Sequence, residues 1–377
     1  MAITTLTTSD YSNKPRSSNL ELYRIICMIM IVAHHYVVNS GLTDEGGVLL
    51  NDYLSGNSIL MSIFGAWGKT GINCFLMITG YYMCTSKITL RKFVKLLCEI
   101  YLYKLLIYAI FLCTGYETIS FFSLVKLLMP GWGLTYGFIP CFIVFYLTIP
   151  FLSILVQNLN KLQHQLLLLL VFSCYTILGS IPSFNVSFNY ITWFGVIFFM
   201  ASYIRLYPSP VFERKTMWGL LSIVLFLLAV TSILVTRLLL GSKVGMGWSL
   251  VHDCNKLFAV AIAVCSFLYF KNLNIKHSKV INAFGASTFG VLIIHANSDA
   301  MRIWLWNDVV DVYGHYCIMP TYKLFLYSTG AVLLIFLFCS LVDMLRISTV
   351  EKWFFNWYDN NLSEKADIFV NRIIKRK

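Results

Sequence analysis

Long runs of apolar residues follow one another along almost the whole chain, separated by short polar segments. The ten longest runs lie at about 20–40, 60–83, 92–114, 138–156, 166–181, 190–206, 217–240, 249–270, 283–299 and 323–346. Most approach the ~20 residues that a helix needs to cross a hydrocarbon core about 30 Å thick. They are continuous rather than alternating, which excludes a transmembrane barrel. The pattern predicts an all-α integral membrane protein with about ten transmembrane helices.

The two ends of the chain are polar. Residues 1–19 contain no apolar core followed by a cleavage site, so we expect a cytoplasmic N-terminal segment and no removable signal peptide. Residues 20–346 form the predicted ten-helix membrane domain. Residues 347–377 are basic and amphipathic, which predicts a cytoplasmic tail along the inner leaflet.

Composition supports the membrane assignment. Hydrophobic residues make up 58% of the 377 and charged residues only 12%, against about 45–50% and about 25% in soluble domains. The net charge of +12 comes from basic residues spread over loops and tail without a compact patch, so no nucleic-acid partner is expected. The 11 cysteines occur singly, which argues against a metal site, a redox motif or a disulfide framework. A bridge between Cys254 and Cys317 stays open.

The basic residues also predict the orientation of the helices. If the N-terminus is cytoplasmic, all but eight of the 29 Lys and Arg fall inside or at inner helix ends. Both termini are therefore predicted to be cytoplasmic. The eight exceptions are Lys69, Lys104, Lys126, Arg237, Lys243, Lys256, Arg302 and Lys323.

Two ionisable residues interrupt the first apolar run. Arg24 and His35 are eleven positions apart, so on a helix they point the same way, about 16 Å apart along the axis. Ionisable groups at membrane depth are costly and usually face a cavity or a partner, which makes the pair a candidate catalytic site. The alternative is that Arg24 reaches a lipid headgroup and His35 only joins two helices. His34 projects about 100° away from His35 and is expected to bond locally instead.

The third apolar run opens with a group of cations, Arg91, Lys92 and Lys95, and continues to Glu99 and Lys104. Such a group suits the phosphates of a nucleotide-bearing donor at the cytoplasmic mouth. A positive-inside flank is the alternative explanation. We expect Glu99 to pair with Lys95 or Lys92 on the same helix.

Histidine and aspartate also lie near each other in two later segments. His295 and Asp299 are four residues apart, so they are expected on one helical face near the outer end of the ninth span. There the carboxylate either orients the imidazole or makes a structural hydrogen bond. The group His252, Asp253 and Lys256 is expected at the outer end of the eighth helix, with a structural role favoured.

Several segments, taken in order, resemble the membrane acyltransferase-3 family of bacterial O-acyltransferases. The first is a basic residue, ten intervening residues and a histidine, which here are Arg24 and His35. The second is GINCFLMITGYY, with Asn73 and Thr79 where the family commonly has Asp and Ser. The family's R-x-x-R element corresponds to two lysines, 92 and 95. FIPCFIVFYLTIPFLSIL and STFGVLIIH resemble two further family segments, the second ending at His295. The resemblance spans about residues 19–346.

This resemblance implies an integral-membrane enzyme of the bacterial plasma membrane. It implies transfer of an acyl group, most often acetyl, from cytosolic acetyl-CoA to a hydroxyl of a cell-surface or lipid-linked glycan. His35 would act as general base or take the acyl group transiently, and both alternatives remain open. Arg91, Lys92 and Lys95, with Arg24 above them, would hold the phosphates of coenzyme A.

Two further residues and several partners follow from the same resemblance. Tyr146 and His295 are secondary candidates for orienting the reactants or stabilising an oxyanion. Membrane lipid surrounds the helices, and proteins of envelope polysaccharide synthesis are possible partners. Acyl chain length and O- versus N-acylation leave no mark in the sequence.

Two other classes of function compete with the enzyme. A transporter would move an acylated sugar or lipid intermediate without covalent chemistry, and a noncatalytic scaffold would have no use for Arg24 and His35. The enzyme hypothesis requires His35 to line an interior passage that a thioester reaches from the cytosol, past Arg24.

Overall fold

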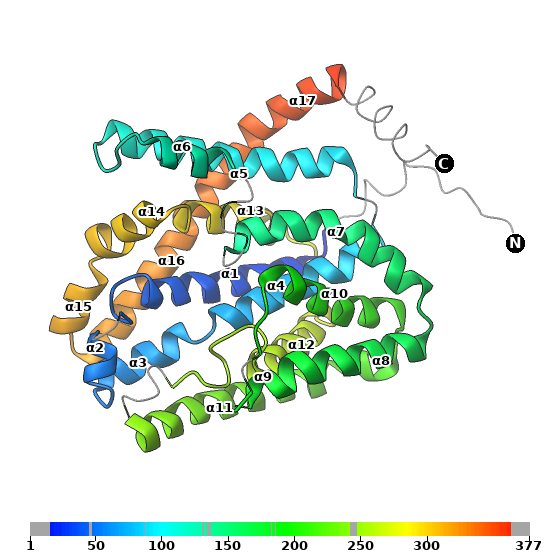
Figure 1. Ribbon diagram of the computed structural model, residues 1–377, viewed down its shortest axis with the longest axis horizontal. Helices are drawn as coiled ribbons and strands as arrows, with labels where there is room; N and C mark the ends of the chain where they lie inside the picture. The colour runs from blue at the N-terminus through cyan, green and yellow to red at the C-terminus, as the bar shows by residue number, and fades with distance from the viewer. Residues whose placement is uncertain are drawn as a thin grey trace, which may run out of the picture.

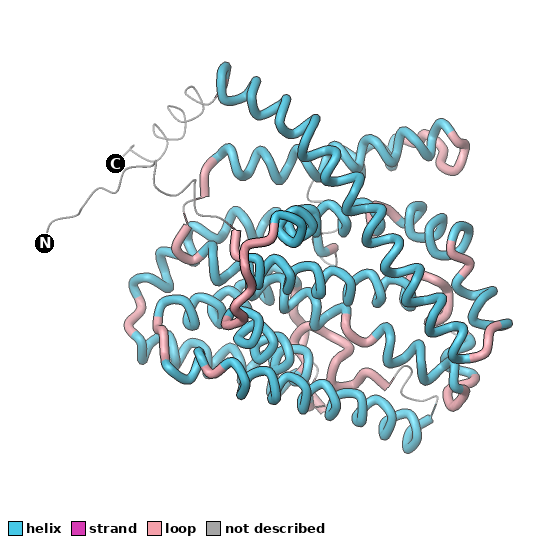
Figure 2. Tube along the Cα trace, turned by 180° about the vertical axis from the view of Figure 1, so that it is seen from behind, coloured by secondary structure: helices cyan, strands magenta, loops and turns pink. Residues whose placement is uncertain are grey.

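The computed structural model describes residues 16–44, 47–86, 88–129, 132, 134, 137–181, 183–184, 186–241 and 247–362 (Figures 1 and 2). Regular structure in these residues is helical throughout, with no strand. The elements are α1 (Ser18–Val38), α2 (Val48–Asn51), α3 (Gly56–Gly65), α4 (Gly68–Met83), α5 (Leu90–Cys113), α6 (Phe121–Leu128), α7 (Phe138–Asn158), α8 (Lys161–Val171), η1 (Phe172–Ile177), α9 (Leu178–Ser180), α10 (Tyr190–Leu206), η2 (Pro210–Glu213), α11 (Lys215–Leu240), α12 (Leu257–Lys271), α13 (Lys279–His295), α14 (Asp299–Ile303), η4 (Trp304–Val309), α15 (Val312–Ile318), α16 (Thr321–Arg346), η5 (Ile347–Glu351) and α17 (Lys352–Asn361).

Each of the ten predicted apolar runs contains a helix. Within the described ranges, seven helical stretches are long and apolar enough to cross a membrane, or eight if α13 and its bent continuation are one span. α10 and α12 are shorter apolar helices of 17 and 15 residues. The all-α membrane class is confirmed, whereas the count of ten and the cytoplasmic placement of both termini stay predictions. The first fifteen residues and the end of the basic tail, 363–377, lie outside the described residues.

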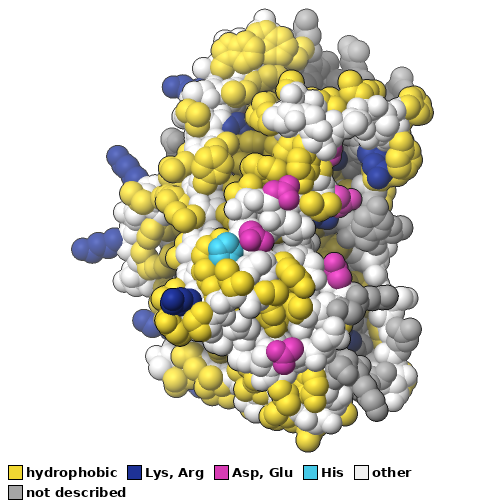
Figure 3. All heavy atoms as spheres, turned by 90° about the vertical axis from the view of Figure 1, so that its left-hand side faces the viewer, with side chains coloured by type: hydrophobic (Ala, Val, Ile, Leu, Met, Phe, Trp, Pro, Cys, Tyr) yellow, Lys and Arg dark blue, Asp and Glu magenta, His cyan; other side chains and the backbone are white. Residues whose placement is uncertain are grey.

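α1 and α4 form the centre of the bundle. Half of the α1 span and 67% of the span formed by α3 and α4 are buried, against 17% for α8 with its continuation and for α11. α1 packs against α3, α4, α13 and α16, while α8 and α11 lie along one edge of the molecule (Figure 1). The face at the left of Figure 1 carries acidic side chains dispersed among hydrophobic ones (Figure 3). The helix that carries Arg24 and His35 is therefore an interior helix.

Two glycines of α4 allow this helix to approach α1 closely. A Cβ atom at Gly68 would lie 2.3 Å from Cγ of His34, and one at Gly71 would lie 2.9 Å from the carbonyl oxygen of Cys27. Small residues permit such backbone contact between membrane helices. The glycines thereby hold the histidine-bearing end of α1 against the start of α4.

A buried network of charges joins α5 to the end of α16. Arg346 lies 2.7 Å from Asp343 Oδ1, 3.2 Å from Glu99 Oε1 and 2.7 Å from Glu351 Oε2. The hydroxyl of Tyr103 donates to Asp343 at 2.8 Å. Because charges at membrane depth are costly when unpaired, the guanidinium stabilises three carboxylates at once.

This network corrects the predicted pairing of Glu99 on its own helix. Glu99 contacts Arg346, and Lys95 instead bonds Glu351. Glu99 is only 8% exposed, and its carboxylate faces α16. Glu99 therefore pairs with Arg346 across the contact between α5 and α16, and not with Lys95, its i, i+4 neighbour on α5.

The segment before α12 also differs from the prediction. α12 begins at Leu257, so His252, Asp253 and Lys256 precede the helix in a turn. The Lys256 ammonium donates to the carbonyl of Gly179, which fits a structural role. The open alternative of a bridge to Cys317 is excluded, since Cys254 is buried, Cys317 is exposed and both are free thiols.

The charge network predicts an asymmetry between two arginines. Removing Arg346 by Arg346→Met leaves the buried carboxylates of Glu99 and Asp343 without their cation and should lower the free energy of unfolding by about 3–5 kcal/mol. Arg91→Met breaks a half-exposed pair with Asp359 and should cost about 0–1 kcal/mol. Thermal unfolding in one detergent measures both, and equal melting temperatures would contradict the structural role of Arg346.

Candidate active site

A cavity of about 510 Å³ lies beside the C-terminal half of α1, with walls from α4, α5, α6, α7, α13 and α14. Both histidines of α1 line it. Four cations and two carboxylates also line it. Its volume falls in the range of about 300–1,000 Å³ that small-molecule sites occupy. His35 therefore faces an interior space, as the enzyme hypothesis requires.

His35 is held by a second imidazole from a distant part of the chain. Its Nδ1 lies 2.9 Å from Nε2 of His295, the last residue of α13. The other nitrogen of His295, Nδ1, lies 2.6 Å from the carbonyl oxygen of Val291. The two side chains form a dyad that joins α1 to α13.

The geometry of this dyad assigns the protons. A carbonyl oxygen only accepts, so Nδ1 of His295 carries the proton and its Nε2 is the acceptor in the neutral ring. Nδ1 of His35 must then donate to it. This leaves Nε2 of His35 with a free lone pair, and no described residue hydrogen-bonds or buries that atom. His35 is thus presented to the cavity as a base.

His34 shares the cavity, contrary to the prediction that only one of the two histidines could face a site. Its Nδ1 donates to the carbonyl of Gly65 at 2.6 Å, which is a bond to the end of α3 and not a local one on α1. The two ring centres are 5.9 Å apart. Both rings line the cavity although they leave the helix about 100° apart.

The predicted pairing of His295 with Asp299 is wrong. The chain bends by 98° between α13 and the segment that starts at Asp299. The carboxylate of Asp299 instead lies 3.0 Å from the guanidinium of Arg302. The bend leaves His295 free to meet His35.

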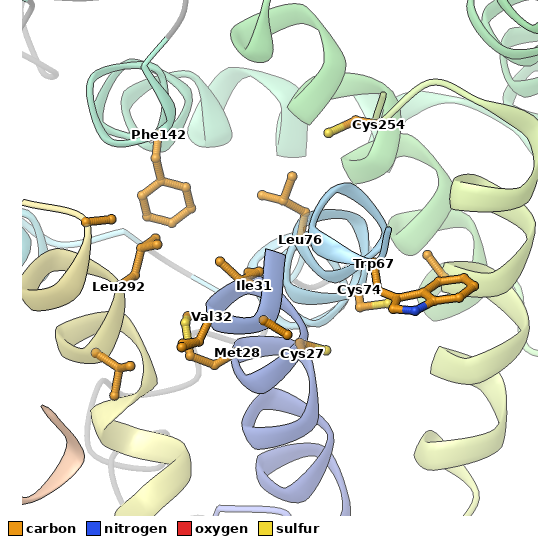
Figure 4. Close-up of a cluster of buried hydrophobic side chains, with 14 of the residues drawn as sticks. Cys27, Met28, Ile31, Val32, Trp67, Cys74, Leu76, Phe142, Cys254 and Leu292 are labelled. Atoms are coloured by element: carbon orange, nitrogen blue, oxygen red, sulfur yellow. The ribbon is translucent and has the colours of Figure 1, made fainter. Parts of the chain in front are cut away.

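Arg24 lies outside the cavity. Its guanidinium is 3.6 Å from Glu21 and stands over the ring of Phe75. The cavity ends at Ile31, about 10 Å further along α1. Figure 4 shows Leu76, Phe142 and Leu292 of three other helices around this part of α1. In the residues that the structure describes, the cavity does not extend to Arg24, and buried apolar side chains of α1 and its neighbours lie between the two.

The predicted donor mouth is covered by the C-terminal helix. Arg91 makes two hydrogen bonds to Asp359, of 2.8 and 2.9 Å, and stacks on Phe355. Its neighbour Lys92 lies on the same exposed turn of α5, and Lys95 bonds Glu351 as described above. Tyr146, the fourth predicted binding residue, stacks on Phe93 of α5. None of these four residues lines the cavity.

Lys104 belongs to the cavity and not to this mouth. It follows Arg91 by thirteen residues on α5, which places it about 20 Å further along the helix. Three more cavity cations were not predicted as site residues, namely Lys69, Lys126 and Arg302. These four cavity cations are all among the eight basic residues that depart from the positive-inside distribution. That departure was the one feature of the sequence that could have indicated them.

Comparison with known families gives one match. Residues 17–342 match the family model described as "Acyltransferase domain". No curated protein and no solved structure matches the chain. The matched range includes α1, the cavity and both histidines of the dyad.

The proton assignment predicts a difference in chemical reactivity between the two imidazoles. Diethyl pyrocarbonate should modify His35, whose Nε2 is free, much faster than His295, whose two nitrogens are both bonded. Peptide mass spectrometry of the protein in nanodiscs measures each rate. The buried His164 serves as an internal unreactive reference. Equal rates at His35 and His295 would contradict the assignment.

Proposed function

This chain belongs to the membrane acyltransferase-3 family, as its motifs predicted, and we propose that it transfers an acyl group, foremost acetyl, from acyl-CoA to a glycan hydroxyl. The observation that supports this proposal is the dyad. It presents an unprotonated imidazole nitrogen to a cavity of sugar-accommodating size. The acceptor occupies the cavity, and the thioester arrives from the end of α1 that carries Arg24.

In the proposed reaction His35 is the general base. Nε2 takes the proton of the acceptor hydroxyl while the oxygen attacks the thioester carbonyl. A C–O bond forms to the acyl carbon and its C–S bond breaks. The coenzyme A thiolate leaves and takes up the proton that His35 had removed from the hydroxyl. The positive charge on His35 strengthens its hydrogen bond to His295, so His295 acts as a positioning residue. A donor-only incubation tests the transient acyl-histidine alternative, which would leave label on the protein.

The donor must pass two obstacles. In the structure Asp359 neutralises Arg91 and Glu351 neutralises Lys95. The phosphates of the donor have to displace both carboxylates. Its pantetheine arm then has to part the apolar side chains between Arg24 and the cavity. Both steps are conformational openings of α17 and of the cluster in Figure 4.

Substitution of the base tests the proposed function. With labelled acetyl-CoA and candidate surface glycans, His35→Ala should reduce acyl transfer by about 10²–10⁴-fold, because the proposed proton acceptor is removed. The assay uses purified protein in nanodiscs, with insertion and melting temperature checked in parallel.

His315→Ala is the matched control, because His315 lies on α15, bonds its own helix and does not line the cavity. It should retain wild-type transfer. Equal transfer by His35→Ala and the wild type would remove the catalytic assignment. Absence of any coenzyme A binding would favour the transporter.

The covered mouth leads to a separate prediction. Asp359→Asn removes the carboxylate that holds Arg91 and should lower KM for acetyl-CoA by about two- to fivefold, since the competing pair is half-exposed. A phosphate-free donor, the acetyl thioester of N-acetylcysteamine, is the control and should show unchanged KM. An equal change for both donors would place the effect outside phosphate binding.

A further inference from the structure

The cations of the cavity divide into two kinds. Lys69 is bonded to the hydroxyl of Tyr190 and lies 3.9 Å from Asp253. Arg302 is paired with Asp299. Lys104 and Lys126, in contrast, have no carboxylate within ion-pair distance among the residues that the structure describes. Among the described residues the cavity therefore holds two ammonium groups without an ion pair, and of its two carboxylates Asp299 is paired whereas Glu117 is not.

The unpaired lysines come from one wall of the cavity, formed by α5 and α6. These two elements lie side by side (Figures 1 and 2), joined by a hydrogen bond from the Tyr101 hydroxyl to the carbonyl of Leu128. Lys126 stands over the rings of Phe122 and Trp132, at 4.8 and 5.8 Å from their centres. This wall thus combines positive charge with an indole that also lines the cavity.

Polar atoms without partners lie on the same wall and beside it. Tyr108 is four residues after Lys104 and so shares its face of α5. Its buried hydroxyl has no hydrogen-bond partner among the described residues, and neither does Nε of Arg302. Both residues line the cavity. Buried polar groups are normally satisfied, so unsatisfied ones in a cavity wall indicate a polar ligand.

Lys104 is the most informative of these groups. It is half-buried in the interior of an apolar helix, where an ammonium group without a counter-ion is costly and marks function. A neutral sugar would leave that cost in place. An acceptor carrying an oxyanion would neutralise Lys104 and Lys126 and would accept hydrogen bonds from Tyr108 and Arg302.

We propose that the acceptor is an anionic glycan, with a carboxylate or phosphate group close to the hydroxyl that is acylated. This inference rests on the proposed function and specifies its substrate. Lys104 and Lys126 bind the oxyanion, Tyr108 donates to it, and Trp132 stacks on the sugar ring. The anion fixes the sugar so that one hydroxyl meets Nε2 of His35.

Binding is tested without turnover by protection of His35 from diethyl pyrocarbonate. The probes are digalacturonate, its uncharged counterpart galactobiose, glucose 1-phosphate and coenzyme A. The anionic sugars should protect His35 at about tenfold lower concentration than galactobiose, because hydrogen bonds to a charged group are lost with the neutral sugar. The carboxylate and phosphate probes, compared with each other, identify the kind of anion.

Variants of the wall assign the effect to its residues. Lys104→Met should abolish the preference for anionic sugars, and Tyr108→Phe should weaken it without removing a charge. Lys323→Met is the matched control, since Lys323 is an exposed lysine outside the cavity, and it should keep the preference.

Two results would overturn the inference. The first is equal protection by digalacturonate and galactobiose, or protection by none of the sugars. The second is protection by coenzyme A that depends on Lys104, which would assign these cations to the donor. Neither result depends on acyl transfer by His35, so failure of this inference is distinguishable from failure of the proposed function.

Discussion

The candidate site depends on one hydrogen bond, between Nδ1 of His35 and Nε2 of His295. It fixes the tautomer of His35 only because the carbonyl of Val291 fixes the proton of His295 in turn. The chain of three groups runs from the backbone of α13 to the cavity. It requires α1 and α13 to be packed together, and the close approach of α1 to α4 at Gly68 keeps the histidine end of α1 in place.

The same packing separates two regions of positive charge. One lies at the start of α5, where carboxylates of η5 and α17 neutralise it. The other lines the cavity around His35. Figure 4 shows part of the apolar cluster around α1, and in the described residues the cavity does not extend to the start of α5.

Some charges inside this bundle have partners within the protein, and one has none among the described residues. Arg346 is surrounded by three carboxylates, and the fully buried Arg237 donates to Ser62, Ser58 and the carbonyl of Tyr53. Those arginines are structural, because the protein supplies all that they need. Lys104 has no such partners among the described residues, although it lies within an apolar helix. The contrast separates charges that stabilise the fold from Lys104, which the proposed anionic acceptor would neutralise.

The sequence by itself determined the helical membrane class, the position of the apolar helices and the family, because run length and motif spacing are local properties. It also singled out His35. The resemblance also named His295, but not its contact with His35, since the two are 260 residues apart and the expected partner of His295, Asp299, is turned aside by a 98° bend. Lys104 follows the basic start of α5 in sequence, yet it lies about 20 Å further along the helix and lines the cavity. Which side chains meet across helices is decided by packing between backbones, and only the tertiary structure contains that information.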